Sequence, residues 1–169
     1  MRNIELKARL NDLAAARQVA QAIATAELGT QIQTDTYFNC PQGRLKLRQI
    51  EHAPAQLVWY LRPDEEGAKS SDYRLVPVTN PETLKAALDS AYGIWCVVRK
   101  RREIFLWDNV RIHLDDVDRL GVFLEFEAVL NNQLQDEAGH AQLAELSRRF
   151  SLQATDLLAG SYSDLLSKT

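Results

Sequence analysis

Apolar and polar residues alternate in short runs along much of the chain, and this period of two is typical of β-strands that bury one face. In the first run, residues 3–10, Ile4 and Leu6 fall on one side while Glu5 and Lys7 fall on the other. Further extended segments are predicted at residues 33–38, 44–49, 56–62, 71–78, 94–106, 110–115 and 122–130. The pattern indicates an antiparallel sheet.

Helix signals interrupt these strands. Asn11 and Asp12 can cap a helix over residues 13–28, and Gly29 is expected to end it in the left-handed conformation. A second helix is predicted from Asn80-Pro81 to near Gly93. Helical periodicity returns over residues 135–150, and residues 154–166 are expected to form a short helix or turn against the barrel mouth. The three tryptophans are expected in the core: Trp59, Trp95 and Trp107.

Charged residues recur at every second position on five of the predicted strands. The columns are Glu5, Lys7 and Arg9; Arg44, Lys46 and Arg48; Lys100 and Arg102; Arg111, His113 and Asp115; Glu125 and Glu127. On one strand such a column is typical of a solvated outer face. Repeated across a sheet, like charges destabilise one another unless counter-charge lies between them, and an enclosed anion would supply it. We therefore predict an α+β fold, a closed antiparallel β-barrel with a polar lumen and helices packed outside.

Composition narrows the class of protein. A chain of 169 residues fits one domain, which we place at residues 1–169. Its 46% hydrophobic and 25% charged residues are typical of a globular protein, and no apolar stretch predicts a signal or membrane span. The net charge of −3 argues against a nucleic-acid partner. The two cysteines lack the spacing of metal ligands, so a zinc site is not expected. A chain of this size without disulfides suits a reducing compartment, and we predict a cytoplasmic protein with no membrane partner.

The carboxylates of the last strand suggest a metal site. Glu125 and Glu127 share a face, and hard divalent cations such as Mg²⁺ or Mn²⁺ take carboxylate oxygens; Asp115 and Glu5 could complete the site. Arginine and lysine columns suit phosphates. His113 could be a general base or metal ligand, although a hydrogen-bonded structural histidine is the commoner case.

Tyrosines could contribute to substrate recognition. Tyr60, Tyr73 and Tyr162 could stack on a base or bind a ribose, whereas amphipathic packing at the barrel rim is the more ordinary role.

These motifs together resemble the CYTH family, the triphosphate tunnel metalloenzymes. N-I-E-L-K at the start is similar to the family's E-x-E-x-K signature, L-K-L-R at residues 45–48 to its basic strand, and V-R-K-R-R to its later V-x-K-x-R. The most specific stretch is H-L-D-D-V-D-R-L-G-V-F-L-E-F-E, residues 113–127. Class IV adenylyl cyclase-like members are also similar at D-T-Y-F, R-P-D-x-x-G-x-K-x-S-D-Y and S-Y-S-D-L-L.

The resemblance implies an eight-stranded tunnel and assigns roles to residues of this chain. Metal would be held by Glu5, Glu125 and Glu127, with Asp115. Phosphates would be held by Lys7, Arg9, Lys46, Arg48, Arg62, Lys100 and Arg102. Catalytic roles are expected for Lys7, Arg102 and Asp115. Asn3 replaces the first signature carboxylate; its amide oxygen can still bind metal, but one negative charge is lost.

Three functions follow from the resemblance. The first is Mg²⁺- or Mn²⁺-dependent conversion of ATP to cyclic AMP and pyrophosphate. The second is hydrolysis of tripolyphosphate, thiamine triphosphate or a nucleoside triphosphate. The third is polyphosphate or nucleotide binding without turnover. A small-molecule triphosphate is the expected partner in each case, and a homodimer fits the cyclase-like branch.

Overall fold

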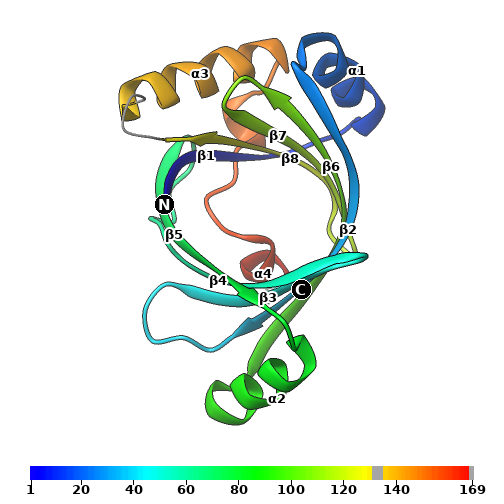
Figure 1. Ribbon diagram of the computed structural model, residues 1–169. Coiled ribbons are helices and arrows are strands. Elements are labelled where there is room, and N and C mark those ends of the chain that lie inside the picture. Colours follow the sequence, from blue (N-terminus) through cyan, green and yellow to red (C-terminus); the bar gives the residue numbers. More distant parts are fainter. Residues whose placement is uncertain (131–134, 168–169) are drawn as a thin grey trace.

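Eight antiparallel strands close into a barrel in the computed structural model of the protein, which describes residues 1–130 and 135–167 (Figure 1). The strand order around the barrel is β1-β5-β4-β3-β2-β6-β7-β8, and β1 closes it by pairing with both β5 and β8. The strands are β1 (Arg2–Arg9), β2 (Ala26–Phe38), β3 (Arg44–Ile50), β4 (Ala53–Leu61), β5 (Lys69–Val78), β6 (Ile94–Trp107), β7 (Val110–Val117) and β8 (Gly121–Val129). The predicted fold class is confirmed.

Helices α1 (Leu13–Ile23), α2 (Pro81–Tyr92) and α3 (Asp136–Arg149) lie on the outside of the barrel wall, and the apolar core lies between them and the strands. α1 and α3 cover the wall formed by β1, β6, β7 and β8 (Figure 1). α2 packs its leucines on a smaller cluster of β2, β3 and β4. The main core contains Ile4, Leu6, Ile112, Phe126, Leu143 and Leu146. In β1, β7 and β8 the apolar residues thus face outward to the helices, which leaves the polar residues to face the lumen.

The first helix is shorter than the sequence predicts. Asp12 caps it as expected, accepting a hydrogen bond from the Ala15 amide at 3.0 Å, but the helix ends at Ile23. Residues 26–28 belong to β2, which pairs with β6. Gly29 does adopt a positive φ of 83°, yet at a register shift within β2 rather than at a helix end. Sheet pairing therefore overrides the helix propensity of this alanine-rich segment.

The tryptophans are less buried than predicted. Trp95 is 39% exposed, and Trp59 and Trp107 are half-buried. Trp59 donates its indole N–H to the Gln42 carbonyl, and the Trp107 ring lies under the Arg149 guanidinium. Tryptophan is amphipathic, so a partly wet position on the barrel exterior suits it.

Among residues 1–130 and 135–167, no helix has both the length and the apolar character needed to cross a membrane.

Candidate active site

The C-terminal segment crosses one end of the barrel (Figure 1). The segment contains η1 (Ala154–Asp156) and α4 (Tyr162–Leu166). The Leu158 amide donates to the Lys7 carbonyl of β1 at 2.9 Å, and Arg62, just after β4, donates to the Ala159 carbonyl at 2.9 Å. The Tyr162 hydroxyl donates to Asp115 of β7 at 2.6 Å. Contacts on opposite walls show that this segment lies across the lumen at the end where β1 finishes.

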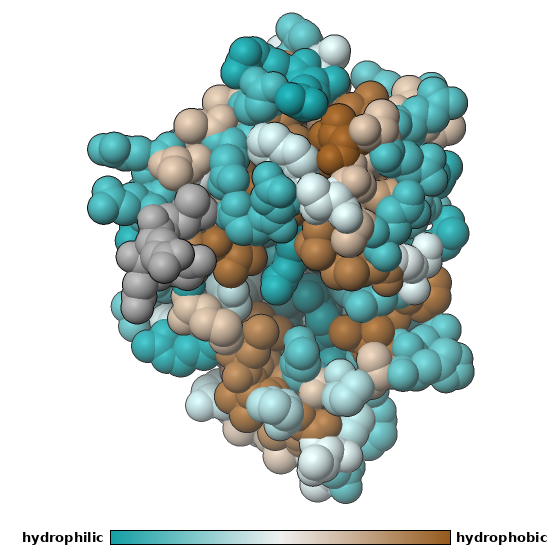
Figure 2. All heavy atoms as spheres, turned by 45° about the horizontal axis from the view of Figure 1, so that its top comes forward, coloured by the Kyte–Doolittle hydropathy of each residue, from teal (hydrophilic) through white to brown (hydrophobic). Residues whose placement is uncertain are grey.

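The lumen is a pocket of about 840 Å³, including solvent at its mouth. Figure 2 shows a hollow with hydrophilic side chains at its floor. Its lining is Asn3, Glu5, Lys7, Tyr37, Lys46, Arg48, Gln56, Val58, Tyr60, Arg62, Ser71, Tyr73, Leu75, Lys100, Arg102, Arg111, Glu125, Glu127, Ser161 and Tyr162. Most members of the alternating charge columns therefore face the inside of the barrel.

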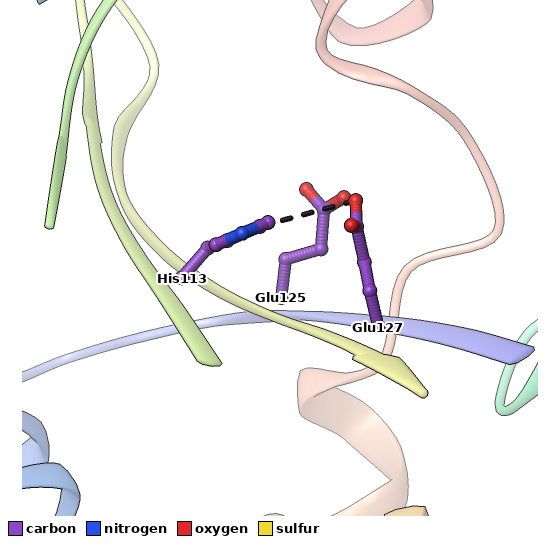
Figure 3. A group of neighbouring side chains, drawn as sticks. All are labelled: His113, Glu125 and Glu127. Carbon is purple, nitrogen blue, oxygen red and sulfur yellow. Dashed lines mark ion pairs between the residues drawn. The ribbon is translucent and has the colours of Figure 1, made fainter. Parts of the chain in front are cut away.

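The carboxylates gather on the wall formed by β1, β7 and β8. Glu5 lies opposite Glu127 in the β1–β8 ladder, and His113 lies opposite Glu125 in the β7–β8 ladder. Figure 3 shows His113, Glu125 and Glu127 converging, with one ligand atom from each within 4.8 Å of the others. Strand register thus brings His113 beside glutamates 12 and 14 positions later in the sequence, and Glu5 opposite a glutamate 122 positions later.

The two glutamates of this wall have opposite protonation tendencies. Burial raises the pKa of Glu127 to about 7, and the neighbouring charge of Glu125 adds to the effect. Burial also opposes ionisation of Glu125, but the charges of Lys7 and Arg102 hold its pKa well below the ordinary value. Lys7 and Arg102 both contact Glu125, with Arg102 Nη2 at 3.0 Å from Oε2. One permanently charged glutamate beside one that titrates near neutrality is an arrangement that a divalent cation would neutralise.

Arg102 is fixed by Asp115. Its Nε and Nη2 donate to the two oxygens of Asp115 at 2.7 and 2.6 Å, and Tyr162 donates to the same carboxylate. Asp115 has no exposed surface; burial would raise its pKa, but Arg102 lowers it to about 2. Both oxygens of Asp115 are therefore engaged, and this carboxylate lies behind the pocket lining rather than in it.

A second buried carboxylate, Asp35 of β2, gathers three cations. Arg48 donates to both of its oxygens at 2.7 and 2.8 Å, Lys100 approaches at 2.9 Å and Lys46 at 3.1 Å. Burial opposes the charge of Asp35, but these cations lower its pKa well below the ordinary value. Burial dominates at Lys100 and lowers the pKa of its amine to about 7. A single buried carboxylate thus points three cations at one part of the tunnel.

The structure brings most of the predicted site residues into the lining and leaves two outside it. The predicted residues in the lining are Asn3, Glu5, Lys7, Lys46, Arg48, Arg62, Lys100, Arg102, Glu125 and Glu127. Asp115 is engaged behind the wall. Arg9 is exposed, donating to the Leu120 carbonyl at 3.1 Å and lying over the Phe123 ring.

The residues on this wall fit a divalent cation. Carboxylate oxygens and an imidazole nitrogen converge, and His113 Nδ1 is one of five buried side-chain atoms of the described residues that have no hydrogen-bond partner; Asn3 Oδ1, of the pocket lining, is another. Buried polar atoms without partners are uncommon and call for an explanation such as an ion. Glu125, Glu127 and His113 are therefore the residues that could hold the metal.

Sequence reasoning assigned no role to Asp35, and it weighed but did not select His113. It considered Tyr162 for base stacking, ribose binding or rim packing, but not for its hydrogen bond to Asp115. Asp35 shares a face with Gln33 and Tyr37 in an alternating run, so the alternation already placed a carboxylate on one strand face. Its three partners come from β3 and β6, and only the register of β2 with both strands shows that they meet.

Comparisons with known proteins agree with this geometry. The CYTH domain family model matches residues 1–162. Among solved structures, the PH1012 protein from Pyrococcus horikoshii OT3 has 26% identity and a TM-score of 0.84, with 96% of this chain and 98% of that chain covered. A Vibrio parahaemolyticus protein named "putative adenylate cyclase" has 22% identity and a TM-score of 0.79, with 98% and 97% covered.

The Hippeastrum protein HpAC1, named "putative adenylyl cyclase" and described as having a dominant triphosphatase activity, has 17% identity and a TM-score of 0.64, with 94% and 91% covered. A search of the curated proteins finds no match. The family expected from the sequence motifs, one of metal-dependent enzymes that act on triphosphates, is confirmed by the match over residues 1–162: the chain belongs to the CYTH domain family.

Proposed function

We propose that the protein takes a nucleoside triphosphate into the tunnel with its terminal phosphate first, and converts ATP to cyclic AMP and pyrophosphate with a divalent cation. The observation that carries this proposal is the distribution of charge along the pocket. The Lys7 and Lys100 amines lie over the ring of Tyr162, in the C-terminal segment that crosses this end. The Lys46 amine lies over the rings of Tyr37 and Tyr60, which belong to the same apolar cluster as Tyr162. Such an arrangement favours a polyanion inserted from the opposite end.

The other end of the lining suits an organic group. Leu75 and Tyr73 come from the second half and the middle of β5, and Gln56 comes from the first half of β4; Leu75 is 38% exposed. An apolar and aromatic rim gives little to an inorganic polyphosphate, whereas a nucleoside can pack on it. These residues support a nucleoside triphosphate over an inorganic chain.

Cyclisation requires charge stabilisation more than covalent chemistry from the protein. The ribose 3′-oxygen bonds to the α-phosphorus, the bond from that phosphorus to the β-phosphate oxygen breaks, pyrophosphate leaves, and the hydroxyl proton is released to solvent. Lys7 and Arg102 would stabilise charge developing on the phosphoryl oxygens. A divalent cation held by Glu125 and Glu127 would supply further charge neutralisation. Asp115 acts as a positioning residue for Arg102, because both of its oxygens are already engaged.

Triphosphate hydrolysis is the second candidate. The cations that grip phosphates are the same in both reactions, and the Hippeastrum protein of the same fold is described as having a dominant triphosphatase activity. The two reactions differ in whether a ribose hydroxyl or a water molecule reaches phosphorus. Binding without turnover is the third candidate, motivated by Asn3 in the first signature position.

A product assay tests the proposal. The protein is incubated with ATP, tripolyphosphate or thiamine triphosphate, each with Mg²⁺, with Mn²⁺ or with a chelator. Cyclic AMP and pyrophosphate from ATP are expected with metal only. Orthophosphate release from every substrate would contradict the cyclase and support triphosphate hydrolysis. The absence of any product would support binding without turnover.

Glu127→Ala provides the matching variant. We expect at least about a hundredfold loss of metal-dependent turnover, as is common when a group that stabilises transition-state charge is removed. The fold should survive, because removing one of two adjacent carboxylates relieves repulsion in the metal-free protein. Glu137→Ala, at an exposed residue of α3, is the control and should retain full turnover. Normal turnover in a folded Glu127→Ala variant would contradict the proposed site.

A further inference from the structure

An imidazole lies beside the two glutamates of the carboxylate wall. His113 projects from β7 into the group formed with Glu125 and Glu127, and one ligand atom from each residue lies within 4.8 Å of the others (Figure 3). Ligand atoms that share an ion sit about 2.0–2.3 Å from it and hence up to about 4.6 Å from one another. The three side chains therefore need only small rotations to reach a common ion.

His113 Nδ1 has no partner that would explain its position as structural. His113 is 4% exposed, and this nitrogen makes no hydrogen bond with the described residues. Glu127 Oε1 lies 3.9 Å from this nitrogen, beyond hydrogen-bond length. Leaving a buried polar atom without a partner costs free energy. An ion between the imidazole and the carboxylates would remove that cost.

The charged groups around Glu125 and Glu127 bear on which metal ion this site can bind. Arg111 Nη1 lies 3.6 Å from Glu127, and Lys7 and Arg102 both contact Glu125, so each glutamate already has at least one cationic neighbour. Between them the wall offers two carboxylates and a nitrogen. Oxygen-only sets suit Mg²⁺, whereas an imidazole nitrogen favours first-row transition ions.

We propose that His113 is a metal ligand and that, with Glu125 and Glu127, it forms a mixed nitrogen–oxygen site for a divalent first-row transition ion such as Mn²⁺ or Co²⁺ in preference to Mg²⁺. The inference rests on the metal site of the proposed function and extends it by one ligand and by the class of metal. Asn3 supports the same preference, because an amide in place of the signature carboxylate lowers the negative charge on which a hard ion depends.

Pulsed electron paramagnetic resonance on the Mn²⁺-loaded full chain tests the ligand directly and without an activity measurement. Histidine nitrogen coupled to Mn²⁺ gives a modulation that changes when the protein is labelled with ¹⁵N-histidine. We expect this coupling in the wild-type protein and its loss in His113→Gln. His140→Gln, at an exposed residue of α3, is the control and should retain the coupling.

Metal titration gives a second readout. His113→Gln should weaken Mn²⁺ and Co²⁺ binding by at least about tenfold, the loss typical of removing a group that supports a metal site. Mg²⁺ binding, which depends on the carboxylates, should change by less than about twofold. Equal losses for all three ions, or none, would contradict a nitrogen ligand.

The wild-type spectrum keeps the proposal falsifiable if His113→Gln fails to fold. Mn²⁺ that binds the wild-type protein without histidine coupling would overturn the His113 ligand and leave the metal-dependent function in place. Histidine coupling in a protein that turns over no triphosphate would support the ligand and overturn the function. Coupling that persists in a folded His113→Gln variant would assign the nitrogen to another histidine and overturn the proposal.

Discussion

Asp35 illustrates how one residue can organise a cationic tunnel. It has no exposed surface, it does not line the pocket, and its two oxygens are shared among Lys46, Arg48 and Lys100. Three cations around one carboxylate leave a net positive charge, so the group is ready for a polyanion without being fully neutralised. The buried acid thus serves the folded state and the phosphate site together.

Replacing Asp35 by asparagine should be strongly destabilising. Removing one partner of a buried ion pair leaves uncompensated charge and costs about 3–5 kcal/mol. Urea unfolding of Asp35→Asn measures this loss, and Asp116→Asn, at an exposed position of β7, is the control. Tripolyphosphate should restore more stability to the variant than to the wild-type protein, because it supplies the missing negative charge. An unchanged free energy of unfolding would contradict the role of Asp35.

The raised pKa of Glu127 predicts how the stability of the metal-free protein depends on pH. Its pKa of about 7 lies above the ordinary 4.5, so between these pH values the folded state keeps a proton that the unfolded state has lost. The contribution of Glu127 to the free energy of unfolding should therefore fall as pH rises from 4.5 to 7, by up to about 1.4 kcal/mol per pH unit. Urea unfolding across this range should show a shallower fall in Glu127→Gln.

The same pKa predicts a proton released on metal binding. A divalent cation prefers the ionised carboxylate, so at pH 6 binding should release close to one proton and affinity should rise with pH until about 7. Calorimetry in buffers of different ionisation enthalpy measures the release. Glu127→Gln should bind the metal ion more weakly and release fewer protons. Glu137→Gln should behave as the wild-type protein does.

Among the elements, α1 shows that a helix outside the barrel can be varied without touching the site. Asp12 caps it, and Ala16 and Ala20 are its buried residues on the main core. Asp12→Ala should lower the free energy of unfolding by about 1 kcal/mol, the usual cost of losing an N-cap. Tripolyphosphate affinity should not change, since α1 does not contribute to the lining. Asn11→Ala, beside the cap, is the control, and weakened ligand binding by Asp12→Ala would contradict this separation.

At the scale of the whole molecule, the eight strands close into a barrel whose lumen forms a tunnel. The C-terminal segment crosses one end of this tunnel. A polyanion that binds there contacts several strands at once. It therefore binds the folded state and not the unfolded chain. Tripolyphosphate at a hundred times its dissociation constant should stabilise the protein by about 2.7 kcal/mol. Chemical denaturation with and without ligand measures this, with sulfate at equal ionic strength as the control. Equal effects of the two anions would contradict a tunnel built for a polyphosphate. A homodimer and a cytoplasmic location stay predictions.

The sequence by itself determined the eight strands, the face of each strand that carries charge, and the family, because period-two alternation and motif spacing are local properties of the chain. Glu5, Lys46, Arg48 and Glu127 could be predicted as lumen residues for this reason. Tertiary structure alone decided that residues 26–28 extend β2, since pairing with β6 outweighs helix propensity. It also decided that Asp115 holds Arg102, that Asp35 gathers three cations, and that His113 meets the two glutamates. These are contacts between strands, and their partners are set by barrel register, which no short stretch of sequence encodes.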